Sequence, residues 1–285
     1  MATILDGAAL AKEIRAELAE KVAALKAEKG ITPRLAVILV GTDPASVTYT
    51  RMKQKASVAT GMLSDLIELP ENSTQESVKD VIKKLNEDRS VHGILVQHPV
   101  PKHLDELDIL STVAVEKDVD GISAVSLGRL LLGTADFVAC TPLGIVTLIE
   151  RYGIPIKGKE AVVVGRSIIL GKPVALALLE RHATVTICHS RTEDLPSVVG
   201  RADILVAAIG KAEFIKGDWV KPGAVVIDAG YNKVEGRDRD VGDVEYETAA
   251  ERASYITPVP GGVGPMTIAM LLSQTVKAAE KYGGA

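Results

Sequence analysis

Short, continuous apolar runs recur along the 285-residue chain. They are RLAVILVG (34–41), MLSDLIEL (62–69), HGILVQ (92–97), EAVVVG (160–165), ATVTICHS (183–190), ADILVAAIG (202–210), GAVVIDAG (223–230) and ASYITP (253–258). Runs of this length are typical of strands, and those without polar alternation fit strands buried on both faces of a parallel sheet. Helical patterns or turns separate them. The sequence therefore predicts an α/β protein.

The chain length fits about two domains. The first three runs, with helices between them, predict an N-terminal α/β domain over residues 1–140. The last five predict a Rossmann-like domain over residues 141–266. A final helix over Met266–Tyr282 follows a Pro/Gly-rich loop, and we place the segment 267–285 on the first domain.

Local signals predict where some helices begin and end. Asp43 and Pro44 begin a helix that Gly61 ends, because proline suits a first helical turn and glycine commonly follows a last one. Ser73 and Glu76 have the spacing of a capping box for the next helix.

The composition excludes several classes of protein. Hydrophobic residues make up 47% and charged residues 25%, as in a soluble globular protein, and a net charge of −4 provides no basic surface for nucleic acid. No apolar run approaches the roughly 20 residues that cross a membrane. The N-terminus lacks a signal peptide, and Cys140 and Cys188 fit reduced core thiols, so we expect a cytoplasmic protein. The five histidines lack metal-ligand spacing, and no metal site is predicted.

A nucleotide site is predicted after the run at 160–165. Gly165 allows a tight turn, Gly171 allows backbone to approach a ligand, and Pro173 suits the start of a helix whose free N–H groups bind phosphate. The spacing is not G-x-G-x-x-G, so a plain strand-turn-helix is the alternative. The next strand ends in CHSRT without an acid, and Arg191 together with Arg166 favours NADP over NAD. Either arginine could instead be a surface charge.

Four further features are candidates for a substrate site. Tyr49 and Lys53 share one face of a helix, although this spacing also occurs by chance. Gln97 ends a strand, where ligands collect in α/β sheets. The turn KDVDG (117–121) has an ordinary solvated acidic turn as its alternative. The loop 256–267 contains three prolines and three glycines, which favours a ligand-facing loop over a linker. A short-chain dehydrogenase would carry Tyr-x-x-x-Lys after the nucleotide turn, whereas here it comes before.

Six motifs in this order resemble the bifunctional methylenetetrahydrofolate dehydrogenase/methenyltetrahydrofolate cyclohydrolase family over essentially the whole chain. They are Y-x-x-x-K (49–53), V-Q-x-P (96–99), K-D-V-D-G (117–121), C-T-P (140–142), G-R-S (165–167) and P-G-G-V-G-P (260–265). The resemblance implies a homodimer of one-carbon metabolism, active in tetrahydrofolate interconversion and purine biosynthesis. It also implies a folate and catalytic domain, an NADP-binding domain and a cleft between them.

The resemblance also implies roles for individual residues. Lys53 corresponds to the catalytic lysine, Tyr49 to the ring stacked on the folate, and Gln97 to the residue that tunes Lys53. Asp120 corresponds to the acid at the pterin edge, and the folate side is completed by Pro260, Gly261 and Gly262. The implied NADP contacts are Gly165, Arg166, Ser167, Ser190, Arg191, Tyr231 and Thr141.

The chain departs from the family pattern at His98, at Leu143, at Tyr231 and in ISAVS (122–126). The catalytic residues are intact, so we expect the chain to be active. The departures bear instead on substrate affinity, on the balance of the two activities and on the strength of the NADP preference.

Two other functions compete with this interpretation. One is an NADP dehydrogenase acting on a small acid, and the other is a nucleotide-binding module without catalysis.

Overall fold

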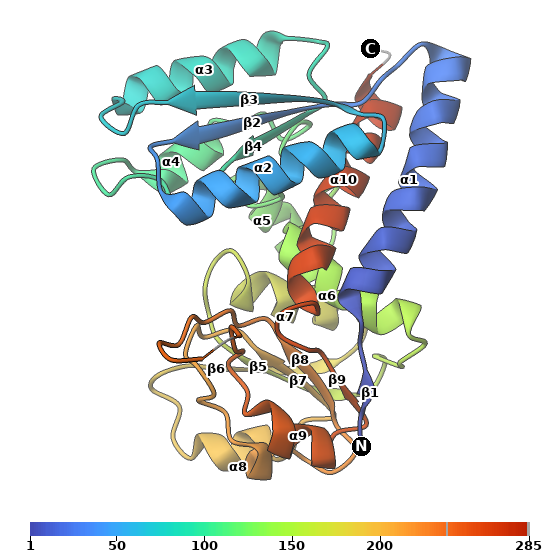
Figure 1. Ribbon diagram of the computed structural model, residues 1–285, viewed down its shortest axis with the longest axis vertical. Helices are drawn as coiled ribbons and strands as arrows, with labels where there is room; N and C mark the ends of the chain where they lie inside the picture. The colour runs from blue at the N-terminus through green and yellow to red at the C-terminus, as the bar shows by residue number, and fades with distance from the viewer. Residues whose placement is uncertain (238, 284–285) are drawn as a thin grey trace. The chain divides into compact units, whose positions relative to one another are not determined.

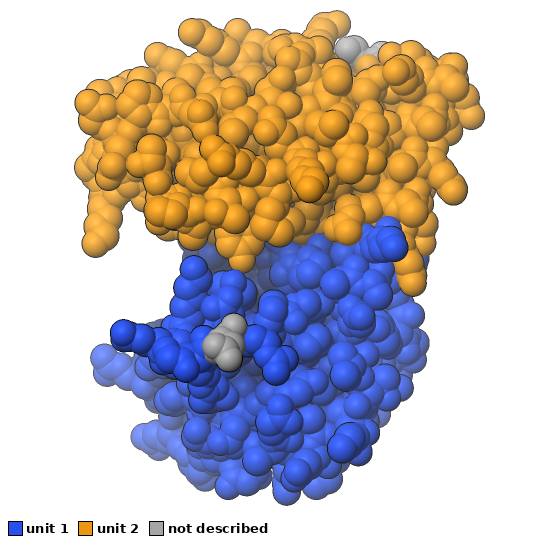
Figure 2. Space-filling view, in the orientation of Figure 1, with its two compact units in different colours: residues 1–12, 141–267 blue, residues 13–140, 268–285 orange. Residues whose placement is uncertain are grey.

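The computed structural model describes residues 1–237 and 239–283, which form two compact units (Figure 2). Unit 1 contains residues 1–12 and 141–267, and unit 2 contains residues 13–140 and 268–285. Residues 1–12 thus group with the second half of the chain, whereas the prediction placed them in the first domain. The reason is a short strand, β1 (Thr3–Ile4), that pairs in parallel with β9 (Tyr255–Ile256).

Unit 2 is built on a three-stranded parallel sheet in the order β3-β2-β4 (Figure 1). Its strands are β2 (Arg34–Val40), β3 (Leu63–Leu69) and β4 (Gly93–Val96). The chain moves from β2 outward to β3 and then back past β2 to β4. Right-handed crossovers therefore place α2 (Pro44–Ala59) and α3 (Gln75–Glu87) on opposite faces of the sheet. The strand order reverses between β2 and β4, so this is where a ligand site is expected.

Unit 1 is built on a six-stranded parallel sheet in the order β1-β9-β8-β7-β5-β6. Its remaining strands are β5 (Glu160–Val164), β6 (Thr184–Cys188), β7 (Ile204–Ala207) and β8 (Val225–Asp228). Here the order reverses between β5 and β7. All eight apolar runs form strands, and the predicted α/β class with a Rossmann-like sheet is confirmed.

The other helices complete the two units. They are α1 (Gly7–Lys29), α4 (Glu106–Ser111), α5 (Ala124–Leu131), α6 (Cys140–Arg151), α7 (Gly171–Leu179), α8 (Leu195–Val199), α9 (Tyr246–Arg252) and α10 (Val263–Tyr282), with the 3₁₀ turn η1 (Gly217–Trp219). None of the described helices combines the length and the apolar character that a membrane span requires. Both cysteines are buried free thiols.

Three predicted helix starts differ from the structure. Thr74, not Ser73, caps α3, because the Thr74 hydroxyl accepts the N–H of Ser77 while the N–H of Ser73 is engaged in a turn with the Pro70 carbonyl. The helix expected from Pro173 begins at Gly171, and the final helix begins at Val263 rather than Met266. In both cases the first helical turn extends into glycine-containing loop sequence.

Two buried aspartates fix the loops that follow β7 and β8. Asp243 is fully buried, and its carboxylate accepts the backbone N–H groups of Ile209, Gly210 and Lys211 at 2.7–2.9 Å and the side-chain amide of Asn232 at 3.0 Å. Four donors converge on one side chain. This arrangement ties the loop after β7 to the loop that returns toward α9.

Asp228 ends β8, and its carboxylate accepts backbone N–H groups of Gly230, Asp243 and Val244 at 2.8–2.9 Å. Burial raises the pKa of Asp228 to about 7, against the backbone hydrogen bonds, and the neighbouring Asp243 acts in the same direction as burial. A Cβ on Gly242 would lie 1.9 Å from Asp228 Oδ2. The loop therefore passes close to the carboxylate at a position where only glycine fits.

We expect Asp243→Asn to lower the free energy of unfolding by about 2–4 kcal/mol, because an amide offers one acceptor oxygen and leaves two of the four buried donors unpaired. Urea denaturation followed by circular dichroism measures this. Asp218→Asn, on the exposed turn η1, is the control and should change the free energy of unfolding little. An Asp243→Asn protein as stable as the wild type would contradict this role.

Candidate functional site

Lys53 and Gln97 form a buried pair in unit 2. Lys53 lies on α2 and is 9% exposed, and Gln97 directly follows β4 and is 7% exposed. Lys53 Nζ donates to Gln97 Oε1 at 2.9 Å. The backbone N–H of Gln97 donates to the Ile38 carbonyl of β2, and its side-chain amide donates to the His98 carbonyl. The pair therefore stands where the strand order reverses between β2 and β4.

The surroundings of Lys53 determine its protonation. Burial lowers the pKa of Lys53, while the nearby Asp120 and Cys140 act in the opposite direction. Burial dominates because the amine has a neutral amide, not a carboxylate, as its hydrogen-bond partner. A lysine with a lowered pKa is better suited than an ordinary surface lysine to accept and release a proton.

The sequence of α2 explains why its inner face is polar. Asp43 caps the helix by accepting the Ser46 N–H at 2.8 Å. The buried residues of α2 are Ser46, Thr50, Lys53 and Ser57. Thr50 and Ser57 satisfy their hydroxyls on carbonyls of their own helix, so Lys53 alone reaches Gln97. Tyr49, one turn before Lys53, is 40% exposed and leaves its ring open to a ligand.

The turn 117–121 carries one buried acid and one half-buried acid. Asp118 is buried, and its carboxylate accepts the N–H groups of Gly121 and Ser123 at 3.0 Å and the Ser126 hydroxyl at 2.5 Å. Asp120 is half-buried and acts on Lys53. Gly121 has φ +69°, and a Cβ there would lie 2.5 Å from the Val138 backbone. The motif is thus a turn that is held by the hydrogen bonds of Asp118 and that carries Asp120.

Sequence reasoning missed two residues of this cluster. The role of Asp118 could have been inferred from Ser123 and Ser126, two hydroxyl residues at the start of α5. Cys140 is buried, and its thiol donates to the Val119 carbonyl at 3.3 Å. Burial raises the pKa of Cys140 well above its usual range. No local signal marked Cys140 as a neighbour of Lys53, because it lies 87 residues further along the chain.

The nucleotide turn lies in unit 1 where the strand order reverses between β5 and β7. A Cβ on Gly165 would lie 2.1 Å from the Ala208 carbonyl oxygen, and a Cβ on Gly171 would lie 2.4 Å from the Gly165 carbonyl oxygen. Both glycines are therefore required for the close approach of strand, turn and helix. The Ser167 hydroxyl accepts the Gly171 N–H at 3.2 Å, at the start of α7. These features fit a dinucleotide phosphate at a helix N-terminus.

Arg166 and Arg191 follow the ends of the neighbouring strands β5 and β6. Both side chains are exposed, and among the described residues neither guanidinium has an ion-pair partner. Ser190 is exposed beside Arg191. Two unpaired guanidinium groups and a hydroxyl at one sheet edge fit a ribose phosphate.

The other predicted contacts lie elsewhere in unit 1. The Thr141 hydroxyl lies 3.0 Å from that of Thr267. Tyr231 is 49% exposed and donates its phenol to Asp240. The Pro260–Gly262 segment packs on the start of α1, where the Ala8 N–H donates to the Gly261 carbonyl at 2.8 Å.

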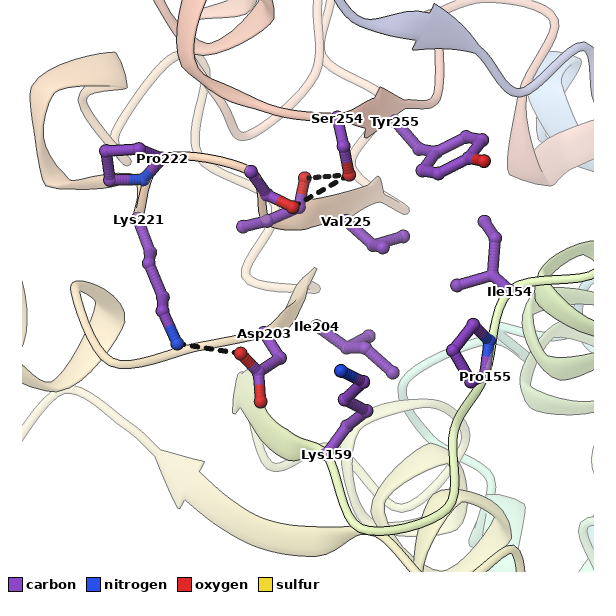
Figure 3. Close-up of a pocket in the computed structure, with 12 residues that line it drawn as sticks. Ile154, Pro155, Lys159, Asp203, Ile204, Lys221, Pro222, Val225, Ser254 and Tyr255 are labelled. Carbon is purple, nitrogen blue, oxygen red and sulfur yellow. Dashed lines mark hydrogen bonds and ion pairs between the residues drawn. The ribbon is translucent and has the colours of Figure 1, made fainter.

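A hollow of about 190 Å³ in unit 1 is not this site (Figure 3). Its lining residues precede β5 and precede or begin β7, β8 and β9, at the sheet edge opposite to the nucleotide turn. Lys221 pairs with Asp203 at 2.7 Å across it, and Ser254 donates to backbone carbonyls. Ligands of α/β sheets collect at the carboxyl ends of strands, so the geometry favours a structural hollow.

Comparison with known proteins identifies the family. Residues 5–120 match the model for the tetrahydrofolate dehydrogenase/cyclohydrolase catalytic domain, and residues 139–283 match the model for the NAD(P)-binding domain of the same family. A relative named bifunctional protein FolD, from Moorella thermoacetica, is 56% identical over 280 residues, covering 98% of this chain and 99% of the relative. The chain belongs to the tetrahydrofolate dehydrogenase/cyclohydrolase family.

Solved structures of this family have the same fold. The bifunctional enzyme FolD of Campylobacter jejuni is 48% identical, with a TM-score of 0.96 over 98% of this chain and 99% of that one. The Trypanosoma brucei enzyme, solved with NADP cofactor and an inhibitor, is 42% identical, with a TM-score of 0.93 over 98% of each chain. The predicted family is confirmed, while the roles of individual residues stay predictions.

Proposed function

We propose that the chain oxidises the one-carbon bridge of methylenetetrahydrofolate with NADP and then hydrolyses the methenyl product to formyltetrahydrofolate, using Lys53 as the proton carrier. The observation that carries this proposal is the buried hydrogen bond from Lys53 Nζ to Gln97 Oε1 at 2.9 Å. It joins a lysine of lowered pKa to a neutral partner in a dehydrogenase/cyclohydrolase chain.

The oxidation step requires little proton chemistry from the protein. When bound, NADP supplies the acceptor for a hydride that leaves the one-carbon bridge. The folate becomes a methenyl cation, and a neutral Lys53 does not oppose this positive charge. Tyr49 offers an exposed ring for stacking on the folate, and Asp120 offers a carboxylate to the pterin N–H donors.

The hydrolysis step requires proton transfer. Water adds to the methenyl carbon and loses a proton, and the ring then opens as a nitrogen gains one. Lys53 accepts the first proton and returns it to the leaving nitrogen. Gln97 holds the amine in place by accepting one of its hydrogens, which leaves the nitrogen lone pair directed elsewhere for the transfer.

The dinucleotide contacts remain our assignment. Gly165 and Ser167 support the turn at the start of α7, and Arg166, Ser190 and Arg191 bind the ribose phosphate that distinguishes NADP. Thr141 and Tyr231 complete the set. Pro260, Gly261 and Gly262 are assigned to the folate.

We expect Lys53→Gln to reduce cyclohydrolase activity by roughly a hundredfold to ten-thousandfold, the range for a lost acid/base group. Dehydrogenase activity should fall much less, because hydride transfer moves no proton. Both rates are measured on one purified protein. Lys55→Gln, an exposed lysine on the same helix, is the matched control and should leave both rates unchanged. Equal losses in the two reactions would mean that Lys53 only positions the substrate.

We expect Arg191→Ala to weaken NADP binding about tenfold to a hundredfold while changing NAD binding little, because a charge-assisted hydrogen bond contributes roughly 1.5–3 kcal/mol. Isothermal titration with each cofactor measures this. Arg201→Ala, at the opposite sheet edge and paired with Glu160, is the control. If both cofactors weaken to the same extent, the phosphate assignment is wrong.

The chain also acts, in our proposal, as a cytoplasmic homodimer that binds no nucleic acid. Strand β6 supports the dimer, because it is an edge of the six-stranded sheet and Ile187 on it is 42% exposed. Sedimentation velocity should give twice the 30.1 kDa mass of one chain. Ile187→Lys should shift the protein toward the monomer, and a wild-type protein that sediments as a monomer at micromolar concentration would refute the dimer.

A further inference from the structure

Gln274 of α10 is a buried amide that contacts two separate segments of unit 2. The side chain is 4% exposed. Its Oε1 accepts the Val138 N–H at 2.9 Å, and its Nε2 donates to the carbonyl oxygens of Val119 at 2.7 Å and Val138 at 2.9 Å. Nε2 also lies 3.4 Å from Cys140 Sγ. One side chain of the C-terminal helix thus binds the turn before Asp120 and the segment before α6.

Gln274 Nε2 has two hydrogens to donate, so its two contacts with backbone oxygens are the principal ones. An amide nitrogen carries two hydrogens, and the Val119 and Val138 oxygens are the two nearest acceptors. The contact with Cys140 is therefore secondary. Both backbone oxygens lie outside the strands of the sheet, so Gln274 supplies donors that a neighbouring strand would otherwise provide.

These contacts hold both sides of Asp120. Val119 immediately precedes it, and the Cys140 N–H donates to the Asp120 carbonyl at 3.2 Å. The Cys140 thiol donates to the Val119 carbonyl at 3.3 Å. Gly121 on the other side lies against the Val138 backbone that Gln274 also binds. The backbone on either side of Asp120 is therefore tied to a segment that Gln274 fixes.

We propose that Gln274 is a positioning residue for the folate site, which fixes the turn carrying Asp120 and so the place of its carboxylate relative to Lys53. The proposal rests on the folate-binding role that we assign to Asp120. Gln274 does not itself contact the substrate, since its polar atoms are used by Val119, Val138 and Cys140. The C-terminal helix is on this account part of the catalytic apparatus.

We expect Gln274→Met to raise the KM for the folate substrate roughly tenfold to a hundredfold in both reactions, because small displacements of binding groups carry costs of this size. Methionine has a similar length without hydrogen-bonding groups. The kcat values should fall less, and NADP affinity should stay unchanged. The pH dependence of hydrolysis should also move to lower pH, because Asp120 and Cys140 are the groups that raise the pKa of Lys53.

Two further variants keep the test decisive. Gln274→Asn retains the amide on a shorter stem and should raise KM in the same direction but less, which serves if Gln274→Met does not fold. Thr275→Val is the matched control, because this buried hydroxyl on the same helix donates to the Leu271 carbonyl of its own helix. It should lower the melting temperature without changing KM.

The outcomes separate this proposal from the proposed function. An unchanged KM in Gln274→Met or Gln274→Asn, or an equal rise in Thr275→Val, would overturn the positioning role. Asp120→Ala is measured in parallel. If Asp120→Ala leaves KM unchanged while Gln274→Met raises it, the failure lies in the role assigned to Asp120, and Gln274 does not act through that carboxylate.

Discussion

The site in unit 2 depends on a buried amine whose hydrogen-bond partner carries no charge. Lys53 donates to the neutral amide of Gln97. A carboxylate at position 97 would hold the lysine equally well but would stabilise its charged form and raise its pKa. The amide fixes the orientation and lets burial lower the pKa. Both proposed steps use the neutral amine, since it accepts a proton from water and does not oppose the forming cation. One choice of partner therefore serves two reactions.

The turn 117–121 shows how two nearby acids can have separate tasks. Asp118 is buried, and burial raises its pKa although three hydrogen bonds favour its charge. Its donors belong to the turn and to the start of α5, so it builds the turn. Asp120, two residues later, is half-buried and lies close enough to Lys53 to act on its pKa. Lys117 completes the turn by donating to the Leu85 and Asp88 carbonyls near the end of α3. These hydrogen bonds hold the turn that carries Asp120.

The sheets could be predicted from sequence because buried parallel strands leave apolar runs that need no long-range information. The cap of α3 could not, since Ser73 and Thr74 offer the same chemistry and a turn with Pro70 decides between them. Strand β1 has two residues and exists only through its pairing with β9. For the site, Lys53 and Gln97 were accessible through strand ends and a family motif. Gln274 was not, because its partners lie more than a hundred residues away and a glutamine inside a helix carries no local signal.

Two acidic side chains lie at the end of the unit 1 sheet where the nucleotide turn is found, and their hydrogen bonds affect the electrostatics there. Asp228 ends β8 and Asp243 binds the loop after β7, at the same end of the sheet where Arg166 and Arg191 follow their strands. Free carboxylates there would repel a phosphate. Asp243 instead receives four hydrogen bonds, and the raised pKa of Asp228, about 7, leaves that group partly protonated at neutral pH. The oxygens of both acids are thus engaged by N–H groups of their own loops, while the side chains of the two arginines are exposed to solvent. The same edge can therefore be held together by carboxylates and still attract an anionic cofactor.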